Sequence, residues 1–144
     1  MFEPAPATDL TCVGKDVPRL EAGEKLTGAA IYTGDMVLPG MLHAKVKESP
    51  HARAKILRID TSKAEALPGV RAVLVGAELD YKVGLYVVDK DILAKNEVRH
   101  YGEAVAAVAA ETVEIASHAV ELIEVDYEVE EPILNQVDAL APDA

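Results

Sequence analysis

The sequence is poor in cysteine and in large aromatic side chains. Its 144 residues include one Cys, Cys12, one Phe and no Trp. A single thiol can form neither an internal disulfide nor a thiolate metal cluster, which favours a reducing compartment. The scarcity of aromatic rings argues against a stacking platform for single-stranded nucleic acid. The core must therefore be built from Val, Leu, Ile and Ala, since hydrophobic residues make up 50% of the chain.

Basic residues are absent from the last third of the sequence. All 14 Lys and Arg residues lie before His100, whereas 11 of the 25 Asp and Glu residues follow it. The net charge of −11 therefore belongs to this last part, which makes nucleic acid and anionic membranes unfavourable partners. A solvated acidic face is the simplest interpretation, although a basic protein surface could also be attracted there.

The sequence shows no signal for secretion or membrane insertion. The first basic residue is Lys15, so the positively charged start of a secretory signal is missing. The most apolar run, Ala104 to Ala110, is far shorter than the roughly 20 residues that span a bilayer. We therefore expect a cytoplasmic protein of about one domain, without a membrane partner.

Hydrophobic periodicity predicts an irregular N-terminal arm, residues 1–25, followed by a single domain, residues 26–144. The strand expected over 41–47 should carry Leu42, Ala44 and Val46 on one face, and His43, Lys45 and Lys47 on the other, polar face. The run 70–75 is typical of a strand buried on both faces. The other strands are expected over 29–33, 52–60, 105–109 and 123–129.

Two helices are expected between these strands. One begins at Thr61 or Ser62, with Ser62 and Glu65 forming a capping box, and ends before Pro68. The other is capped by Thr112 and runs to about Leu122. Residues 77–97 should form an irregular excursion that contains one short strand. The resulting strand–helix–strand units predict an α+β fold with a mixed sheet.

No pattern of catalytic or metal-binding residues stands out. The spacings of His43, His51, His100 and His118 are not those of zinc sites. Ser49-Pro50-His51 places a hydroxyl near an imidazole but lacks the glycines of a nucleophile elbow. The cluster His100-Tyr101-Gly102-Glu103 either lines a site or turns the chain. We predict no catalytic, cofactor-binding or metal-binding residue in this chain, and an inert thiol at Cys12.

An ordered set of short motifs carries a family resemblance. It comprises residues 13–19, 24–33, 38–45, 49–52, 59–62, 67–70, 98–99, 102–109 and 123–127, which together extend over nearly all of residues 13–140. The set closely resembles the opening of the large, molybdenum-binding subunit of the xanthine dehydrogenase and aldehyde oxidase family. Two positions depart from the family pattern: Glu48 stands where Arg is usual, and Ala104 where Pro is usual.

The resemblance implies an α/β-hammerhead domain within an enzyme that hydroxylates an aldehyde or an electron-poor heterocycle with oxygen from water. In that family a molybdenum–pterin centre, [2Fe–2S] clusters and FAD carry the chemistry. The family's pterin-binding, substrate-binding and base groups lie in later domains, so no family catalytic residue maps onto this chain, which alone should not catalyse the reaction.

The leading hypothesis is therefore a hammerhead domain or small subunit with a structural and assembly role. Its partners would be the molybdenum-binding domains and the iron–sulfur and flavin components. On its own the chain would expose an apolar patch and could form homo-oligomers. A free-standing binding module that reuses the fold stays open as an alternative, as does a hydrolase that uses Ser49 and His51.

Overall fold

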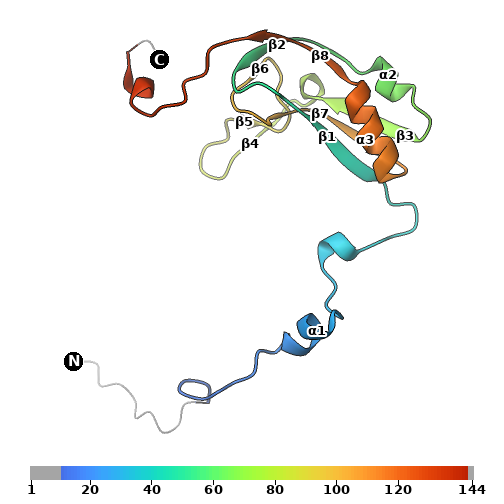
Figure 1. The fold of residues 1–144 in the computed structure, drawn as a ribbon, viewed down its shortest axis with the longest axis vertical. Helices are drawn as coiled ribbons and strands as arrows, with labels where there is room; N and C mark the ends of the chain where they lie inside the picture. Colours follow the sequence, from blue (N-terminus) through green and yellow to red (C-terminus); the bar gives the residue numbers. More distant parts are fainter. Residues whose placement is uncertain (1–10, 143–144) are drawn as a thin grey trace. The chain divides into compact units, whose positions relative to one another are not determined.

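The computed structural model describes residues 11–142, which form two compact units, one ending at Leu38 and the other beginning at Pro39 (Figure 1). The first unit contains helix α1 (Ala22–Thr27), where the sequence predicts only irregular chain. Gly28 ends this helix in the left-handed conformation, with φ of 75°, which glycine adopts at little cost.

The prediction of a strand over 29–33 is wrong. The structure has a 3-10 turn there, Thr33–Asp35, in which the Tyr32 N–H donates to the Asp35 carboxylate over 3.0 Å. A strand needs a neighbouring strand to pair its backbone groups. The side chains of Ile31 and Tyr32 are exposed, and no strand pairs with this segment in the described chain.

In the second unit, sheet A has three strands in the order β1 (His43–Glu48), β7 (Ala104–Ala110) and β3 (Val70–Val75). β7 pairs with both other strands and is therefore the central strand, and both of its ladders are antiparallel. Its expected range of 105–109 is confirmed. The alanines of β7 let a helix approach closely on one side of the sheet.

Sheet B also has three strands, in the order β6 (Glu97–Val98), β2 (Ala54–Asp60) and β8 (Glu124–Val129), again with antiparallel ladders. The strands expected over 52–60 and 123–129 are thus confirmed within a few residues. A register shift between Ile56 and Arg58 marks a bulge at Leu57, whose side chain is exposed.

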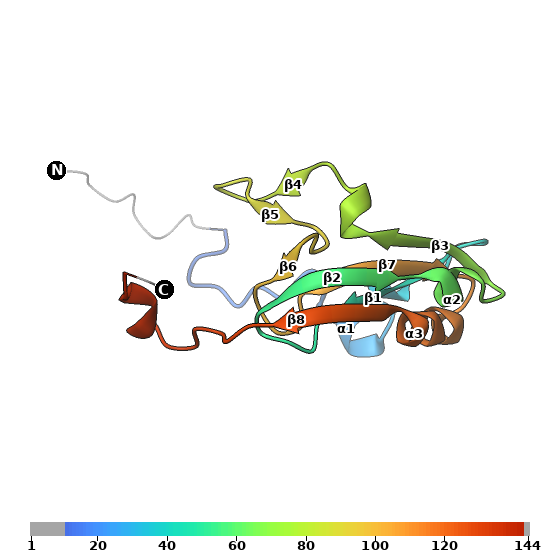
Figure 2. The same cartoon turned by 90° about the horizontal axis from the view of Figure 1, so that it is seen from above.

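The two expected strand–helix–strand motifs are present, and each contributes one strand to each sheet. One is β2–α2–β3, with α2 spanning Ser62–Glu65, and the other is β7–α3–β8, with α3 spanning Val113–Leu122. Figure 2 shows α2 and α3 close together at one end of the long β2–β8 pair. Because each helix connects two different sheets, neither motif creates a parallel pair. The α+β fold class is confirmed.

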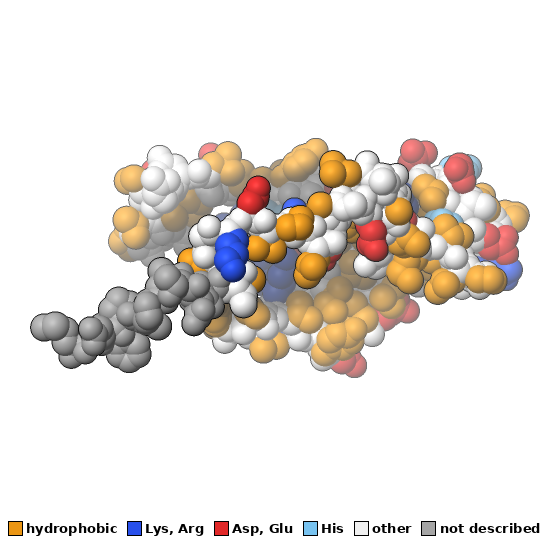
Figure 3. Space-filling view, turned by 90° about the horizontal axis from the view of Figure 1, so that it is seen from below, with side chains coloured by type: hydrophobic (Ala, Val, Ile, Leu, Met, Phe, Trp, Pro, Cys, Tyr) orange, Lys and Arg blue, Asp and Glu red, His pale blue; other side chains and the backbone are white. Residues whose placement is uncertain are grey.

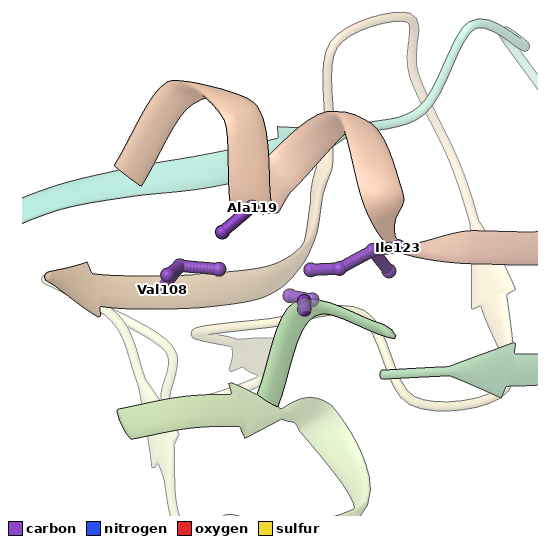
Figure 4. Packing of buried hydrophobic residues seen from close by; sticks show 5 residues of the cluster. Val108, Ala119 and Ile123 are labelled. Carbon is purple, nitrogen blue, oxygen red and sulfur yellow. The ribbon is translucent and has the colours of Figure 1, made fainter. Parts of the chain in front are cut away.

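The main core lies between α3 and the inner face of β7. Val108, Ala119 and Ile123 are almost fully buried and point toward one another (Figure 4). A second, adjoining cluster around Ala54 and Val105 joins β7 to sheet B. The core is thus made of aliphatic side chains, as the shortage of aromatic residues requires.

The start of α3 agrees with the sequence prediction. The Thr112 hydroxyl accepts a hydrogen bond from the Ile115 N–H over 3.3 Å, which satisfies one of the free donors of the first turn. A hydrogen bond from its own backbone N–H, and then the Thr112 side chain, lower the pKa of Glu114.

Helix α2 begins differently from the prediction. The expected capping box of Ser62 and Glu65 does not form. Instead, the Asp60 carboxylate accepts hydrogen bonds from the Ser62 N–H over 3.0 Å and from the Ser62 hydroxyl over 2.6 Å. The hydroxyl and then the N–H of Ser62 lower the pKa of Asp60. The helix is one turn long and starts directly after β2. The acceptor for the N–H group at its start is therefore Asp60, not the Ser62 side chain.

The region between β3 and β6 contains a two-stranded hairpin rather than one short strand. A 3-10 turn, Gly76–Glu78, leads into β4 (Lys82–Val83), which pairs with β5 (Lys90–Asp91). Beyond β8, a further 3-10 turn spans Asp138–Leu140.

Candidate interaction surfaces

The two faces expected for β1 are present, and it is the polar face that packs against the rest of the domain. Lys45 pairs with Val108, whose side chain is in the core, so His43, Lys45 and Lys47 lie on the side of the sheet that α3 covers. Lys47 extends across and donates to the Val120 carbonyl of α3 over 3.2 Å. Its aliphatic stem can cover the helix while its amine is satisfied there. The apolar side chains of β1 are consequently turned away from the core.

The other side of sheet A forms an apolar surface, which we call the outer face. Register places Ala44, Ala109 and Ala72 in one row across the three strands, and Val46, Ala107 and Leu74 in the next. Val46 is 45% exposed and Leu74 is 38% exposed. Four of the six side chains are alanine, so the surface is nearly flat and can accept another layer of structure.

The outer face is covered only at one end. Val105, on the next row of β7, is fully buried and packs with Ala94 and Val98. The remaining rows stay open, so β3 is not buried on both faces as predicted: Arg71, Ala72 and Leu74 are all exposed on this edge strand. Similarly, Val129 at the end of β8 is exposed, although Val125 and Tyr127 alternate inward as expected.

Ser49 and His51 do not form a nucleophile–base pair. Ser49 is 1% exposed, and its hydroxyl donates to the His51 carbonyl and accepts from the His51 N–H, both over 3.1 Å. The His51 ring instead packs edge-on against Tyr127, with 5.1 Å between ring centroids. Burial raises the pKa of the Tyr127 hydroxyl. The hydroxyl and imidazole therefore have structural contacts, and no activated nucleophile results.

The cluster 100–103 turns the chain. Gly102 has φ of 79°, and its N–H donates to the Ser49 carbonyl over 2.9 Å. The Glu103 carboxylate accepts from the Arg99 N–H over 2.6 Å. The same segment also borders two cavities of about 380 and 480 Å³. The first is lined by charged residues, including Lys82, Asp91 and Arg99, and the second lies beside Pro132–Leu134.

Potential metal ligands are dispersed. Across residues 11–142, no three His, Cys, Asp or Glu side chains are grouped so that they could hold a metal ion. Cys12 is exposed in the first unit. Glu48 is exposed where the register shifts at the end of β1, opposite Ala104, so the two departures from the family pattern face each other.

Charged side chains on sheet B are largely paired with one another. Glu130 accepts from Arg53 over 3.0 Å and lies 3.1 Å from the Lys55 amine, which also contacts Glu128 over 3.4 Å. These contacts, first with Lys55 and then with Arg53, lower the pKa of Glu130. Lys55 of β2 and Arg53 just before it therefore neutralise part of the acidic last third. Local sequence patterns could not predict this pairing, because the partners are more than 70 residues apart.

No helix within the described range, residues 11–142, has the length and apolar composition needed to cross a membrane. Hydrophobic side chains nevertheless gather over much of the face shown in Figure 3. The exposed apolar residues of the second unit include Leu134, Val137 and Leu140 after β8, Val46 and Leu74 on the outer face, and the residues of the hairpin between β4 and β5. The sequence contained a signal for the latter, the run Leu85-Tyr86-Val87-Val88 outside any regular period.

Two small antiparallel sheets joined by strand–helix–strand motifs, with one helix over the central alanine-rich strand, define an α/β hammerhead domain. The family model described as "Aldehyde oxidase and xanthine dehydrogenase, a/b hammerhead domain" matches residues 27–131. The chain therefore belongs to the aldehyde oxidase and xanthine dehydrogenase family, and the expected resemblance is confirmed.

Individual relatives agree. The chain is 38% identical over 145 residues to "Probable hypoxanthine oxidase XdhD" of Escherichia coli (strain K12), covering 94% of this chain and 15% of that protein. It is 36% identical to "Nicotinate dehydrogenase large molybdopterin subunit" of Eubacterium barkeri, covering 94% of this chain and 32% of that protein. It thus spans less than a third of the length of either relative.

Solved structures give the same result. The CO dehydrogenase from Oligotropha carboxidovorans superposes with a TM-score of 0.86 at 40% identity, over 91% of this chain and 17% of that one. The aldehyde oxidoreductase from Desulfovibrio gigas superposes with a TM-score of 0.79 at 30% identity, over 88% of this chain and 16% of that one.

Proposed function

We propose that this hammerhead domain serves a molybdenum-dependent hydroxylase as a structural element that packs against the molybdenum-binding part of the enzyme. The observation that supports this role is the outer face, an open apolar surface three strands wide with no polar side chain in its two rows. Exposed apolar patches of this kind mark interaction surfaces in folded proteins.

The chemistry of the described residues supports a role without a bound cofactor. They offer no grouped metal ligands, and the lone Cys12 cannot supply the several thiolates that an iron–sulfur cluster requires. The molybdenum–pterin centre, [2Fe–2S] clusters and FAD of such an enzyme would therefore be held by other domains or subunits. The enzyme as a whole would hydroxylate an aldehyde or an electron-poor heterocycle.

The first test is the native mass and metal content of the chain, isolated from its source under mild conditions. The proposal expects an assembly of more than about 100 kDa that contains molybdenum, iron and flavin. Such an assembly should survive mild isolation, because an interface of about 800 Å² per side is enough to hold two proteins together. A chain that is recovered near its own mass of 15.4 kDa, without metal, contradicts the proposal.

The outer face itself is tested by the double substitution Val46→Lys and Leu74→Lys. Both side chains are already partly exposed, so the domain should fold, whereas two buried ammonium groups in the interface should prevent assembly. Leu57→Lys is the matched control, because Leu57 is exposed on sheet B, away from the outer face. If the control loses assembly as well as the double variant, the result contradicts the assignment of the interface to the outer face.

A further inference from the structure

The hairpin β4–β5 carries the most concentrated apolar exposure of the second unit. Its short ladder pairs Lys82 with Asp91 and Val83 with Lys90. The loop beyond it contains four consecutive apolar side chains, Leu85 to Val88, which we call the tip. Leu85 is 88% exposed and Tyr86 is 94% exposed, and Val87 and Val88 are each about two-thirds exposed.

The tip is closed by a contact that only glycine permits. A Cβ atom on Gly84 would lie 1.7 Å from the Val87 carbonyl oxygen. That oxygen belongs to the backbone, so a larger residue would force the loop to open. The tip therefore has a defined shape before it meets a partner, which reduces the entropy lost on binding.

The base of the hairpin is charged. Lys82, Asp89, Lys90 and Asp91 line the cavity of about 380 Å³ together with Arg99. An exposed tyrosine among aliphatic side chains, surrounded by charged groups that stay hydrated, has the composition of an interface centre and its rim. Tyrosine is especially frequent among the residues that dominate binding energies.

We propose that the tip inserts into an apolar pocket on a separate protein subunit of the assembly. This inference rests on the proposed function and names a second contact besides the outer face. Several relatives are named as one subunit among others, "large molybdopterin subunit", "large chain" and "large subunit", so assemblies of this family offer separate chains as partners.

Charge argues against the other occupants. An anionic bilayer attracts clusters of basic residues, whereas Lys82 and Lys90 are outnumbered by Asp80, Asp89 and Asp91. A second copy of the chain would bring together two molecules of net charge −11. An uncharged pocket on a different protein meets neither obstacle.

Photo-crosslinking in the native assembly tests the proposal. Tyr86 is replaced by the photoreactive residue p-benzoylphenylalanine, and the product is identified by peptide mass spectrometry. The expected product joins residue 86 to one other subunit. Cross-links to a second copy, to lipid or to the same polypeptide, or the absence of a product, would overturn it. The same replacement at Tyr101, which is 74% exposed on the 100–103 turn, controls for non-specific capture.

Affinity gives an independent measurement. Tyr86→Ser should weaken binding of the subunit identified by the cross-link about 30-fold, as removal of a central aromatic contact does. Tyr101→Ser should leave the affinity within about threefold, and unchanged circular dichroism would show that both variants fold. If the assembly contains no molybdenum, the proposed function fails, while the cross-link at residue 86 still decides whether the tip enters another subunit.

Discussion

Ser49 joins the end of β1 to the turn that precedes β7. Its N–H donates to the Glu103 carbonyl and its own carbonyl accepts from the Gly102 N–H, both over 2.9 Å. Its buried hydroxyl bonds both the N–H and the carbonyl of His51. One small polar residue thus fixes the path of two segments that are more than 50 residues apart.

Ser49→Ala should lower the free energy of unfolding by about 1–3 kcal/mol, because the His51 N–H loses its acceptor in a buried position. Urea denaturation followed by circular dichroism measures this change. Ser117→Ala, on the partly exposed surface of α3, should change the stability by less than about 0.5 kcal/mol. A neutral Ser49→Ala variant would contradict the role assigned to the hydroxyl.

The ion pairs of Glu130 predict that the stability of the fold depends on pH. Lys55 and Arg53 hold the pKa of this carboxyl below its ordinary value of 4.5, so the folded state favours the charged form. The stabilisation is therefore complete above the pKa of the unfolded chain and is lost as the pH falls through the lower pKa of the folded chain.

Glu130→Gln should accordingly lower the melting temperature at pH 6 and have a smaller effect near pH 3. Since the pair is exposed, 1 M salt should reduce the difference at pH 6. Thermal unfolding at the two pH values and two salt concentrations provides the test. A loss of melting temperature on Glu130→Gln that is larger near pH 3 than at pH 6 would contradict the predicted direction of the pH effect.

At the scale of elements, sheet A separates an inner face that packs from an outer face that is open. Val108→Ala and Val46→Ala remove the same two methyl groups from neighbouring strands on opposite faces. Val108 is 1% exposed, so its replacement should cost about 2 kcal/mol, whereas Val46→Ala should cost less than about 0.5 kcal/mol. Equal losses of stability in chemical denaturation would contradict this assignment of the two faces.

Gly76 sets the distance between the end of β3 and the segment that covers the outer face. A Cβ atom on Gly76 would lie 2.4 Å from the Ala94 carbonyl oxygen and 2.6 Å from that of Leu93. Gly76→Ala should therefore destabilise the domain by about 1–3 kcal/mol. Gly34→Ala, whose Cβ meets nothing within 4 Å, should be neutral. Equal melting temperatures of the two variants would exclude this close approach.

Local patterns predicted most elements but not which face of them is covered. Thr112, the alanines of β7 and the alternation in β8 carry their signals within a few residues, and those predictions are confirmed except at Val129, which is exposed. The covered face of β1 could not be identified locally, because alternation identifies two faces without saying which one meets the rest of the domain. The outer face is apolar like a core but exposed, so the rule that apolar residues face inward fails on β1.

At the scale of the whole molecule, the two cavities near the 100–103 turn have volumes in the range of small-molecule sites. The structural role predicts that a panel of small metabolites leaves the melting temperature of the chain unchanged within about 1 °C. A ligand at about 100 times its dissociation constant would contribute about 2.7 kcal/mol and raise the midpoint by several degrees. Such a rise would favour the free-standing binding module instead.

The strand order has a consequence for the synthesis of the protein. Sheet A pairs β1 with β7, and sheet B pairs β2 with β8, across roughly 60 to 70 residues of sequence. Neither sheet can be completed until its last strand leaves the ribosome. At 5–20 residues per second, the roughly 80 residues between the ends of β1 and β8 take about 4–16 s to translate. Until those strands emerge, β1 and β3 lack their central partner β7, and β2 lacks its long partner β8, so the nascent chain should depend on chaperones.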